Sequence, residues 1–307
     1  MSLLVEAIHL KKSFGATHAV QDVSLSVRAG EAYGLVGPDG AGKTTTLRLL
    51  VGALQMDAGV ARVGDWDVSK RPEEARAALG YLAQRFSLYG DLTVLENLKF
   101  FGEVRGVVGA RFTQRAETLL NFVGLGGFES RRADQLSGGM KQKLGLACAL
   151  IHEPKVLLLD EPTTGVDPVT RQDFWQLLIR VLGEGTAVIV STPYMDEAIR
   201  CNRIGFMHAG KILVEGTPRE LTQPLAGRVW ELVAQPKQQA RAVAQRQPEV
   251  QDVLTFGDRL HLHVSETQTP LAHLSAALAE AGVHVQRLRP IAPSLEDVFI
   301  HLLKSPI

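Results

Sequence analysis

The segment from residue 37 to residue 44 restricts this chain to a small number of folds. It reads Gly-Pro-Asp-Gly-Ala-Gly-Lys-Thr, follows the short apolar run Ala32 to Val36, and precedes a helical pattern from Lys43 to Leu54. Glycines in such a turn let backbone N–H groups approach a phosphate closely, and the start of the helix adds a positive dipole. An ordinary glycine-rich turn is the alternative, but the flanking strand and helix favour a nucleotide-binding α/β domain.

The residue types in this phosphate-binding loop (residues 37–44) predict separate roles. Lys43 is expected to reach the β- and γ-phosphate oxygens, and the Thr44 hydroxyl is expected to ligate Mg²⁺. The predicted cofactors are therefore ATP and Mg²⁺. The predicted nucleotide-binding residues in and beside the loop are Gly37, Pro38, Asp39, Gly40, Ala41, Gly42, Lys43, Thr44 and Thr45.

Two acids follow the apolar run that begins at Val156. Asp160 and Glu161 lie just past its carboxyl end, which is where open parallel sheets bind their ligands. Asp160 is predicted to hold the Mg²⁺ shell, and Glu161 is then free to polarise a water. A strand that merely ends at solvent is the alternative, and the phosphate-binding loop upstream makes it the weaker one.

Two kinds of sheet and a helical insertion are expected. Residues 3–10 and 17–28 partly alternate apolar and polar side chains, as half-buried antiparallel strands do. Residues 156–160 and 187–191 are largely apolar, with a helical pattern over 168–182 between them, which is typical of a parallel sheet covered on both faces. Apolar residues then recur at helical spacing over much of residues 88–151.

The length of 307 residues fits about two domains. We predict an ATP-binding domain over residues 1–222, with the helical lobe at about 86–152, and a small ferredoxin-like α+β domain over 228–307, whose strand and helix patterns follow a split β-α-β order. The predicted fold class is α/β: a P-loop NTPase with a mostly parallel core sheet, an antiparallel β subdomain, the inserted helical lobe and the small C-terminal domain.

The composition limits which partners the chain can bind and in which compartment it is expected. Lys and Arg total 33 and Asp and Glu total 33, so there is no excess positive charge to hold a nucleic acid. Cys148 and Cys201 lack metal-ligand spacing and are expected to be buried thiols in a reducing compartment. The start of the chain lacks a basic region before its apolar residues, and no window holds about 18 apolar residues, so we expect a cytoplasmic protein without a membrane span or secretion signal.

The segment Leu-Ser-Gly-Gly-Met opens another helical stretch. Ser137 is placed to cap this helix, while Gly138 and Gly139 would expose amides at its positive end. The residues alone leave a second anion site and an ordinary helix cap equally open.

The order of these motifs resembles the ATP-binding subunit of ABC transporters over residues 3–220. The resemblance includes Gln84 in YLAQRFSLYGDLTVLENL, the signature LSGGM, VLLLDEP, and the D-loop TTGVD that ends at Asp167. It implies that two subunits meet head to tail, so that the signature residues Ser137, Gly138 and Gly139 contact the partner's nucleotide. It also implies that Gln84 contacts Mg²⁺ or water as a catalytic residue beside Glu161, and links the site to a membrane permease.

The resemblance also has implications for adenine binding and for the direction of transport. It implies that Phe14 stacks on adenine; the alternative is that Phe14 is a core residue. The tail from Pro293 to Phe299 looks like the C-terminal extension of drug and polysaccharide exporters, and Asp39, where Asn is usual, is similar to the first ATP-binding half of multidrug exporters. The resemblance therefore implies an export motor at the inner face of the cell membrane, held there by its permease.

One position departs from the family. After residues 187–191 the family presents a histidine that contacts the γ-phosphate, and this chain has Pro193. Proline offers neither a side-chain donor nor a backbone N–H. We predict that the chain's own site turns over slowly, and that its signature serves a histidine-bearing second subunit, although a homodimer is also possible and Tyr194 is a candidate replacement donor.

Other readings stay open. Pro193 also motivates a regulatory subunit that binds ATP and hydrolyses little of it. A soluble ABC ATPase without a transport role is a further alternative, although neither a second cassette nor a long coiled-coil insertion is present. In the tail, His261, His263, His273 and His284 are candidate metal ligands, but alternating His261 and His263 are more simply one face of a strand.

Overall fold

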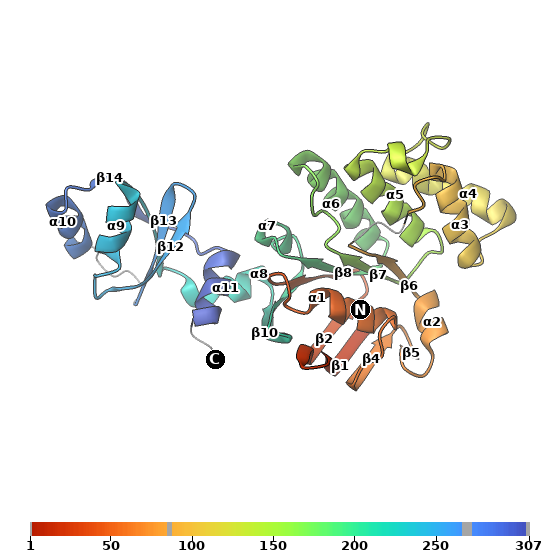
Figure 1. Ribbon diagram of the computed structural model, residues 1–307, viewed down its shortest axis with the longest axis horizontal. Helices are drawn as coiled ribbons and strands as arrows, with labels where there is room; N and C mark the ends of the chain where they lie inside the picture. Colours follow the sequence, from red (N-terminus) through yellow and green to blue (C-terminus); the bar gives the residue numbers. More distant parts are fainter. Residues whose placement is uncertain (1, 85–87, 266–271, 305–307) are drawn as a thin grey trace. The chain divides into compact units, whose positions relative to one another are not determined.

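The computed structural model describes residues 2–84, 88–265 and 272–304. Contacts divide the chain into two compact units, Met1–Glu215 and Gly216–Ile307, and each is described by itself (Figure 1). The domain limits predicted from the sequence, 1–222 and 228–307, stay a prediction. The expected start of the helical lobe at residue 86 and the last residues of the expected second domain, 305–307, lie outside the described residues.

The first unit contains a sheet in the order β5-β4-β1-β2-β10-β9-β3-β8-β7-β6. Strands β3, β6, β7, β8 and β9 are parallel where they pair. Every residue of β3, β7 and β8 is buried, which explains their continuous apolar runs. The bounds of the five strands are β3 (Ala32–Val36), β6 (Leu79–Leu82), β7 (Val156–Asp160), β8 (Ala187–Thr192) and β9 (Arg203–His208).

The other strands of this sheet form its antiparallel part. Strand β1 pairs antiparallel with both β2 and β4, and in β2 the buried residues Val23, Leu25 and Val27 alternate with polar ones. The expected antiparallel subdomain is therefore confirmed. Its strands are β1 (Leu3–Phe14), β2 (Thr17–Arg28), β4 (Ala58–Val63) and β5 (Trp66–Asp67), and β10 (Lys211–Gly216) pairs parallel with β2.

Helices flank the parallel strands and form the separate lobe. Helix α1 ends at Val51 rather than at the expected Leu54, because Gly52 adopts a left-handed φ of 71° and caps it. Figure 1 shows α3, α4 and α5 grouped together, and they pack against one another as the expected helical lobe. The helices are α1 (Lys43–Val51), α2 (Pro72–Ala77), α3 (Val94–Val104), α4 (Gly109–Val123), η1 (Ala133–Gln135), α5 (Gly138–Leu150), α6 (Pro168–Gly183) and α7 (Met195–Ala198).

The second unit has the expected split β-α-β pattern. Its strands lie in the order β12-β13-β11-β14, with antiparallel pairing throughout, and one face packs Leu232, Leu262 and Leu278 into a core. The elements are α8 (Pro218–Thr222), η2 (Gln223–Leu225), β11 (Val229–Gln235), α9 (Lys237–Ala244), β12 (Val250–Phe256), β13 (Arg259–Val264), α10 (Ala272–Glu280), β14 (His284–Pro290) and α11 (Leu295–Lys304).

Helix α11 was not expected from the sequence pattern. Ser294 and Asp297 cap it reciprocally, because the Asp297 N–H donates to Ser294 Oγ at 3.1 Å and the Ser294 N–H donates to Asp297 Oδ2 at 2.8 Å. A serine followed three residues later by an acid is a sequence sign of a helix start, so this helix could have been predicted.

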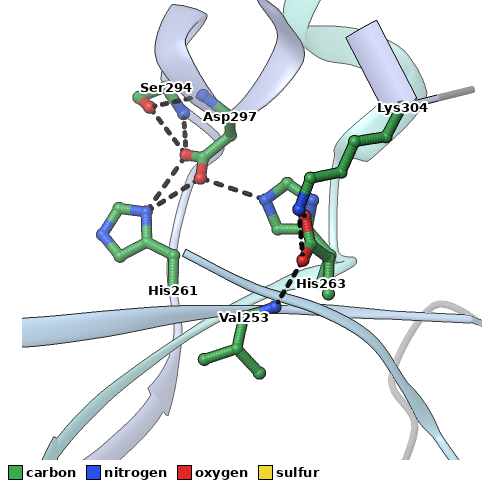
Figure 2. A network of polar contacts seen from close by, with 7 residues as sticks. Val253, His261, His263, Ser294, Asp297 and Lys304 are labelled. Atoms are coloured by element: carbon green, nitrogen blue, oxygen red, sulfur yellow. Dashed lines mark hydrogen bonds and ion pairs between the residues drawn. The ribbon is translucent and has the colours of Figure 1, made fainter. Parts of the chain in front are cut away.

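A buried carboxylate network lies on the face of the sheet β12-β13-β11-β14 opposite to this core (Figure 2). Asp297 is 0% exposed and contacts His261 Nδ1 at 2.9 Å and His263 Nε2 at 3.0 Å. Burial raises the pKa of Asp297, but hydrogen bonds from His261, His263 and Ser294 outweigh it and hold that pKa well below its usual range. Within the described ranges, no three His, Cys, Asp or Glu side chains are arranged to hold a metal ion.

Two smaller findings concern the sequence expectations. Cys148 and Cys201 are buried free thiols, as expected. Among the helices that the structure describes, none combines the length and the apolar character needed to cross a membrane.

Candidate functional site

The phosphate-binding loop joins β3 to α1 and has no room for side chains at two of its glycines. A Cβ on Gly37 would lie 2.1 Å from the Met207 carbonyl oxygen, and one on Gly42 would lie 2.3 Å from the Ala19 carbonyl oxygen. Gly42 also has a φ of 106° and is the N-cap of α1. The loop therefore packs tightly on the neighbouring strands, and its backbone leads directly into the N-terminus of α1.

Lys43 is the first residue of α1 and is 4% exposed. Its Nζ donates to the carbonyl oxygens of Gly37 at 2.8 Å and Pro38 at 3.0 Å, and it pairs with Glu161 Oε1 at 3.2 Å. These contacts hold the ammonium group inside the loop. A charge in this position is well placed to meet a bound phosphate.

Asp160 is the last residue of β7 and is completely buried, and each of its carboxylate oxygens accepts hydrogen bonds from neighbouring hydroxyl groups. Thr44 Oγ1 and Ser191 Oγ donate to Oδ1 at 3.0 and 2.7 Å, and the Tyr81 hydroxyl donates to Oδ2 at 3.3 Å. Burial and the nearby Asp160 charge raise the pKa of Tyr81 to about 12, so it remains a donor. The Thr44 and Asp160 oxygens suit Mg²⁺, which prefers oxygen ligands and keeps several waters.

Glu161 follows Asp160 and has an unusual backbone conformation. Its φ is 49°, in the left-handed region, and its N–H donates to Ser191 Oγ at 3.0 Å. Its side chain is 6% exposed and accepts a hydrogen bond from Gln84 Nε2 at 2.9 Å on the oxygen opposite to the one that pairs with Lys43. The structure thus brings Glu161, Gln84 and Lys43 together.

These groups border a cavity of about 480 Å³ beside the loop. Phe14, at the end of β1, lies on its wall and is 50% exposed, so it is not a core phenylalanine. The full lining is Phe14, Thr17, His18, Ala19, Gln21, Asp39, Gly40, Ala41, Gly42, Lys43, Thr44, Thr45, Gln84, Glu161 and Ala209. The cavity combines an exposed aromatic ring with a cationic, amide-rich loop, which suits a nucleotide.

The signature residues do not line this cavity. Ser137 Oγ accepts from the Met140 N–H at 3.3 Å, so it caps α5. A Cβ on Gly138 would meet nothing within 4 Å, whereas one on Gly139 would lie 2.2 Å from Thr170 Cγ2. The signature therefore stands at the N-terminus of α5 and is not part of the lining of the cavity beside the chain's own phosphate-binding loop.

Asp167 caps α6 and does not line the cavity either. Its Oδ1 accepts from the N–H groups of Val169 and Thr170 at 3.1 and 3.0 Å, and Thr170 Oγ1 donates to Oδ2 at 2.6 Å. Hydrogen bonds lower the pKa of Asp167. The one from the Thr170 hydroxyl has the largest effect, and the one from the Thr170 N–H comes next. This geometry gives Asp167 a structural role within the chain.

Pro193 lies between β8 and α7 and is half-buried. On one side of it, the Thr192 carbonyl oxygen accepts a hydrogen bond from the Gly37 N–H at 3.4 Å. On the other side, the Tyr194 N–H donates to Thr192 Oγ1 at 3.0 Å, and the Arg171 guanidinium lies 4.7 Å from the centroid of the Tyr194 ring. The segment is thus connected to the loop by its backbone.

Sequence reasoning gave no role to Ser191, which contacts both acids. The sign that could have found it is the position of Ser191 at the carboxyl end of β8, because β7 and β8 pair in parallel with Asp160 opposite Ser191. Polar residues at adjacent parallel strand ends share one edge of the sheet. Tyr81 and Glu197 were also missed, since their contacts depend on the folded arrangement.

Comparison with known proteins shows the family. The ABC transporter family model matches residues 20–164, and the model for the C-terminal domain of DrrA1-3-like ATP-binding proteins matches residues 216–303. The chain is 35% identical over 306 residues to the daunorubicin resistance ATP-binding protein DrrA2 of Streptomyces coeruleorubidus, covering 97% of this chain and 94% of that protein. This chain belongs to the family of ABC transporter ATP-binding proteins, and the predicted resemblance is confirmed.

A second relative is more similar but longer. The chain is 43% identical over 290 residues to the "Probable multidrug ABC transporter ATP-binding protein YbhF" of Escherichia coli, and the match covers 93% of this chain but only 49% of that protein. The chain therefore spans about half the length of this relative.

Solved structures support the fold. A structure described as the dimeric post-hydrolysis state of the ATP-binding cassette MJ0796 with ADP and Pi has a TM-score of 0.64 and 26% identity, covering 70% of this chain and 98% of that one. An ATP-binding subunit of an ABC transporter has a TM-score of 0.67 and 28% identity, covering 73% and 93%. The predicted α/β P-loop fold class is confirmed.

Proposed function

We propose that this chain is the ATP-binding motor subunit of an ABC exporter, which couples ATP binding and hydrolysis to transport through a separate membrane permease. The observation that carries this proposal is the convergence of Lys43, Thr44, Gln84 and Glu161 on one cavity, with Asp160 directly behind Thr44. The names of the relatives, which refer to multidrug transport, daunorubicin resistance and Nod factor export, support an export role. In this proposal the permease holds the chain at the inner face of the cell membrane.

In this proposal the loop binds the triphosphate of ATP. The backbone amides from Gly40 to Thr45, the N-terminus of α1 and the Lys43 ammonium supply positive charge and donors, while Phe14 stacks on the base. Thr44 and Asp160 would hold Mg²⁺, with Gln84 close to it; the ion, when bound, neutralises phosphate charge. Glu161 accepts a hydrogen bond from the attacking water and orients it, and Gln84 keeps the Glu161 carboxylate in place.

A second ATP-binding subunit completes the site in this proposal. Ser137, Gly138 and Gly139 lie at the N-terminus of α5, and their amides would contact the nucleotide bound by the partner. Two features support this arrangement: these residues do not line the cavity of their own chain, and the structurally similar cassette MJ0796 is described as dimeric. Asp167, which holds the start of α6, would stand at the same interface.

Pro193 is proposed to slow hydrolysis at this chain's own loop. Loss of a preorganised donor to transition-state charge typically costs about a hundred- to a thousandfold in rate. The expected effect of Pro193→His is therefore a gain of about a hundredfold in single-turnover ATP hydrolysis, with Mg-ATP affinity nearly unchanged. Pro193→Ala is the matched control, because alanine restores the backbone N–H but adds no side-chain donor; it is expected to give no comparable gain.

The result of this substitution decides between two versions of the proposal. A gain with histidine alone supports a degenerate site paired with a histidine-bearing subunit. A rapid rate in the unmodified chain, with no gain on Pro193→His, rejects the slow site and favours a symmetric pair of equal subunits.

Pro193 also favours one alternative function, a regulatory subunit that binds ATP with little hydrolysis. The discriminating variant is Glu161→Gln in this chain only, assayed in the complex with its permease and second subunit. The motor proposal predicts a lower ATP turnover by the complex. Unchanged turnover favours the regulatory role.

A further inference from the structure

Glu197 is a buried acid that the proposed chemistry does not use. It lies in α7 and is 1% exposed. Its two oxygens contact different parts of the chain, because Thr163 Oγ1 donates to Oε1 and Thr192 Oγ1 donates to Oε2 at 2.7 Å. The Arg171 Nε also lies 3.4 Å from Oε1.

The first of these parts contains Glu161 and the D-loop (residues 163–167). Thr163 is 1% exposed, and its carbonyl oxygen accepts from the Val166 N–H at 3.1 Å. Thr164 then turns back to Glu161, with its N–H 3.2 Å from the Glu161 carbonyl oxygen and its Oγ1 3.3 Å from Oε2. A displacement of Thr163 would therefore move Glu161 as well.

The second part is the switch segment (residues 192–194), which contains Pro193. Thr192 is 1% exposed and uses its hydroxyl twice, as donor to Glu197 and as acceptor from the Tyr194 N–H. Its carbonyl oxygen accepts from the Gly37 N–H of the phosphate-binding loop. Thr192 thus connects Glu197 to the start of the phosphate-binding loop.

A buried carboxylate is costly unless it is fully hydrogen-bonded and paired. Glu197 meets this condition only while Thr163, Thr192 and Arg171 all remain in place. Each segment is therefore held in position by the same charge, and neither can shift without leaving that charge short of a donor.

We propose that Glu197 is a positioning residue for ATP hydrolysis. It holds the segment that contains Glu161 and the D-loop at a set distance from the switch segment. The inference rests on the proposed function, since it concerns the same reaction. Positioning by Glu197 is especially important in this chain, because Pro193 brings no side-chain donor to the phosphate. The switch segment therefore acts only through its position.

The test compares Glu197→Gln with Asp196→Asn in the full chain. Glutamine keeps the size of the side chain but replaces one acceptor oxygen by a donor, so one threonine loses its acceptor. Asp196 is the matched control: it is the adjacent acid, its side chain is 68% exposed, and it contacts the same Arg171 at 3.2 Å. Thr163→Val is the second test variant, and it removes a single donor.

Single-turnover hydrolysis, with protein in excess over labelled ATP, and equilibrium binding of Mg-ATP are measured for each variant. Glu197→Gln is expected to lower the hydrolysis rate constant by about ten- to a hundredfold, as small displacements of reacting groups do, while the dissociation constant for ATP changes by less than about twofold. Asp196→Asn is expected to leave both constants unchanged. An unchanged rate, or an equal loss of rate and affinity, overturns the inference.

Hydrogen exchange provides a readout that does not require hydrolysis. Glu197→Gln is expected to speed exchange of amides in residues 163–167 and 194–198 together, and Thr163→Val mainly in residues 163–167, with β3 unaffected. Unchanged exchange in both segments overturns the inference. If the unmodified chain in its complex hydrolyses no ATP, the proposed function fails, and coupled exchange in the two segments still decides whether Glu197 connects them.

Discussion

Both units of the molecule bury acidic side chains, but they use them differently. In the first unit, Asp160 and Glu161 contact hydroxyl, amide and ammonium groups, several of which belong to residues that line the cavity. In the second unit, Asp297 contacts two histidines and Ser294, all within the unit. The comparison teaches that a buried charge points to a ligand site when its partners also line a cavity, whereas the contacts of Asp297 join parts of its own unit.

Glu231 extends the comparison in the second unit. It is 2% exposed and pairs with Arg259 at 2.9 Å, Arg287 at 3.3 Å and Arg289 at 3.1 Å. Burial raises the pKa of Glu231, but Arg287 and Arg289 outweigh it and lower that pKa. Each of these arginines is about half exposed, so the buried acid holds three long side chains against the sheet.

The largest effect is expected from Lys43→Ala, which tests whether the acids and cations of the first unit serve a ligand. Removing the ammonium removes charge-assisted bonds to phosphate, so Mg-ATP should bind about a thousandfold more weakly in a calorimetric titration. Lys70→Ala is the control, because that side chain is 80% exposed. Binding within about threefold of the unmodified chain would contradict the assignment.

A smaller effect on stability is expected in the second unit. Asp297→Ala leaves His261 and His263 without their shared acceptor, and it should lower the free energy of unfolding of this unit by about 3 kcal/mol. Regional hydrogen exchange of β13 and α11 measures this loss. Asp258→Ala, at a side chain 80% exposed in the same unit, should change little. If both variants lost the same free energy of unfolding, Asp297 would stabilise the unit no more than an exposed acid does.

The same carboxylate predicts a pH dependence. Because the pKa of Asp297 is lower in the folded chain than its ordinary value of 3.8, the folded state binds fewer protons than the unfolded state. The contribution is fully present above that value and is lost as pH falls below it. Exchange protection of β13, corrected for the intrinsic rate, should fall below about pH 4, and it should fall less in Asp297→Asn.

The smallest effect is expected at Phe14, and it tests whether the cavity of the first unit binds the base of a nucleotide. Phe14→Ala should weaken ATP binding by about threefold to tenfold, which is the usual size of an aromatic stacking term. Inorganic tripolyphosphate should bind equally well to both proteins, since it has no base to stack. Phe14→Tyr keeps a ring and should keep the affinity for ATP. If Phe14→Ala weakened the binding of tripolyphosphate as much as that of ATP, Phe14 would support the phosphate-binding loop and would not contact the base.

Sequence reasoning predicted the family, the fold class and part of the cavity lining, but it did not name Thr17, His18, Ala19, Gln21 or Ala209. Local patterns were enough to place Lys43 at the start of α1 and Asp160 at the end of β7: a glycine turn before a helix, and an acid after an apolar strand. Sequence reasoning failed for Ser191 and Glu197, whose partners depend on strand register and on a short helix after β8. It also missed α11, although Ser294 and Asp297 give the local sign of a helix start.

The tight approach of α6 to Gly139 affects how variants of the signature should be interpreted. Thr170 cannot easily turn away, since its hydroxyl is bound to Asp167 at 2.6 Å, so a methyl group at position 139 collides inside the chain itself. Inactivity of a Gly139→Ala protein is therefore ambiguous, because internal steric clash and a damaged subunit contact give the same phenotype. Combining it with Thr170→Ser, which removes the colliding methyl but keeps the hydroxyl, separates the two causes.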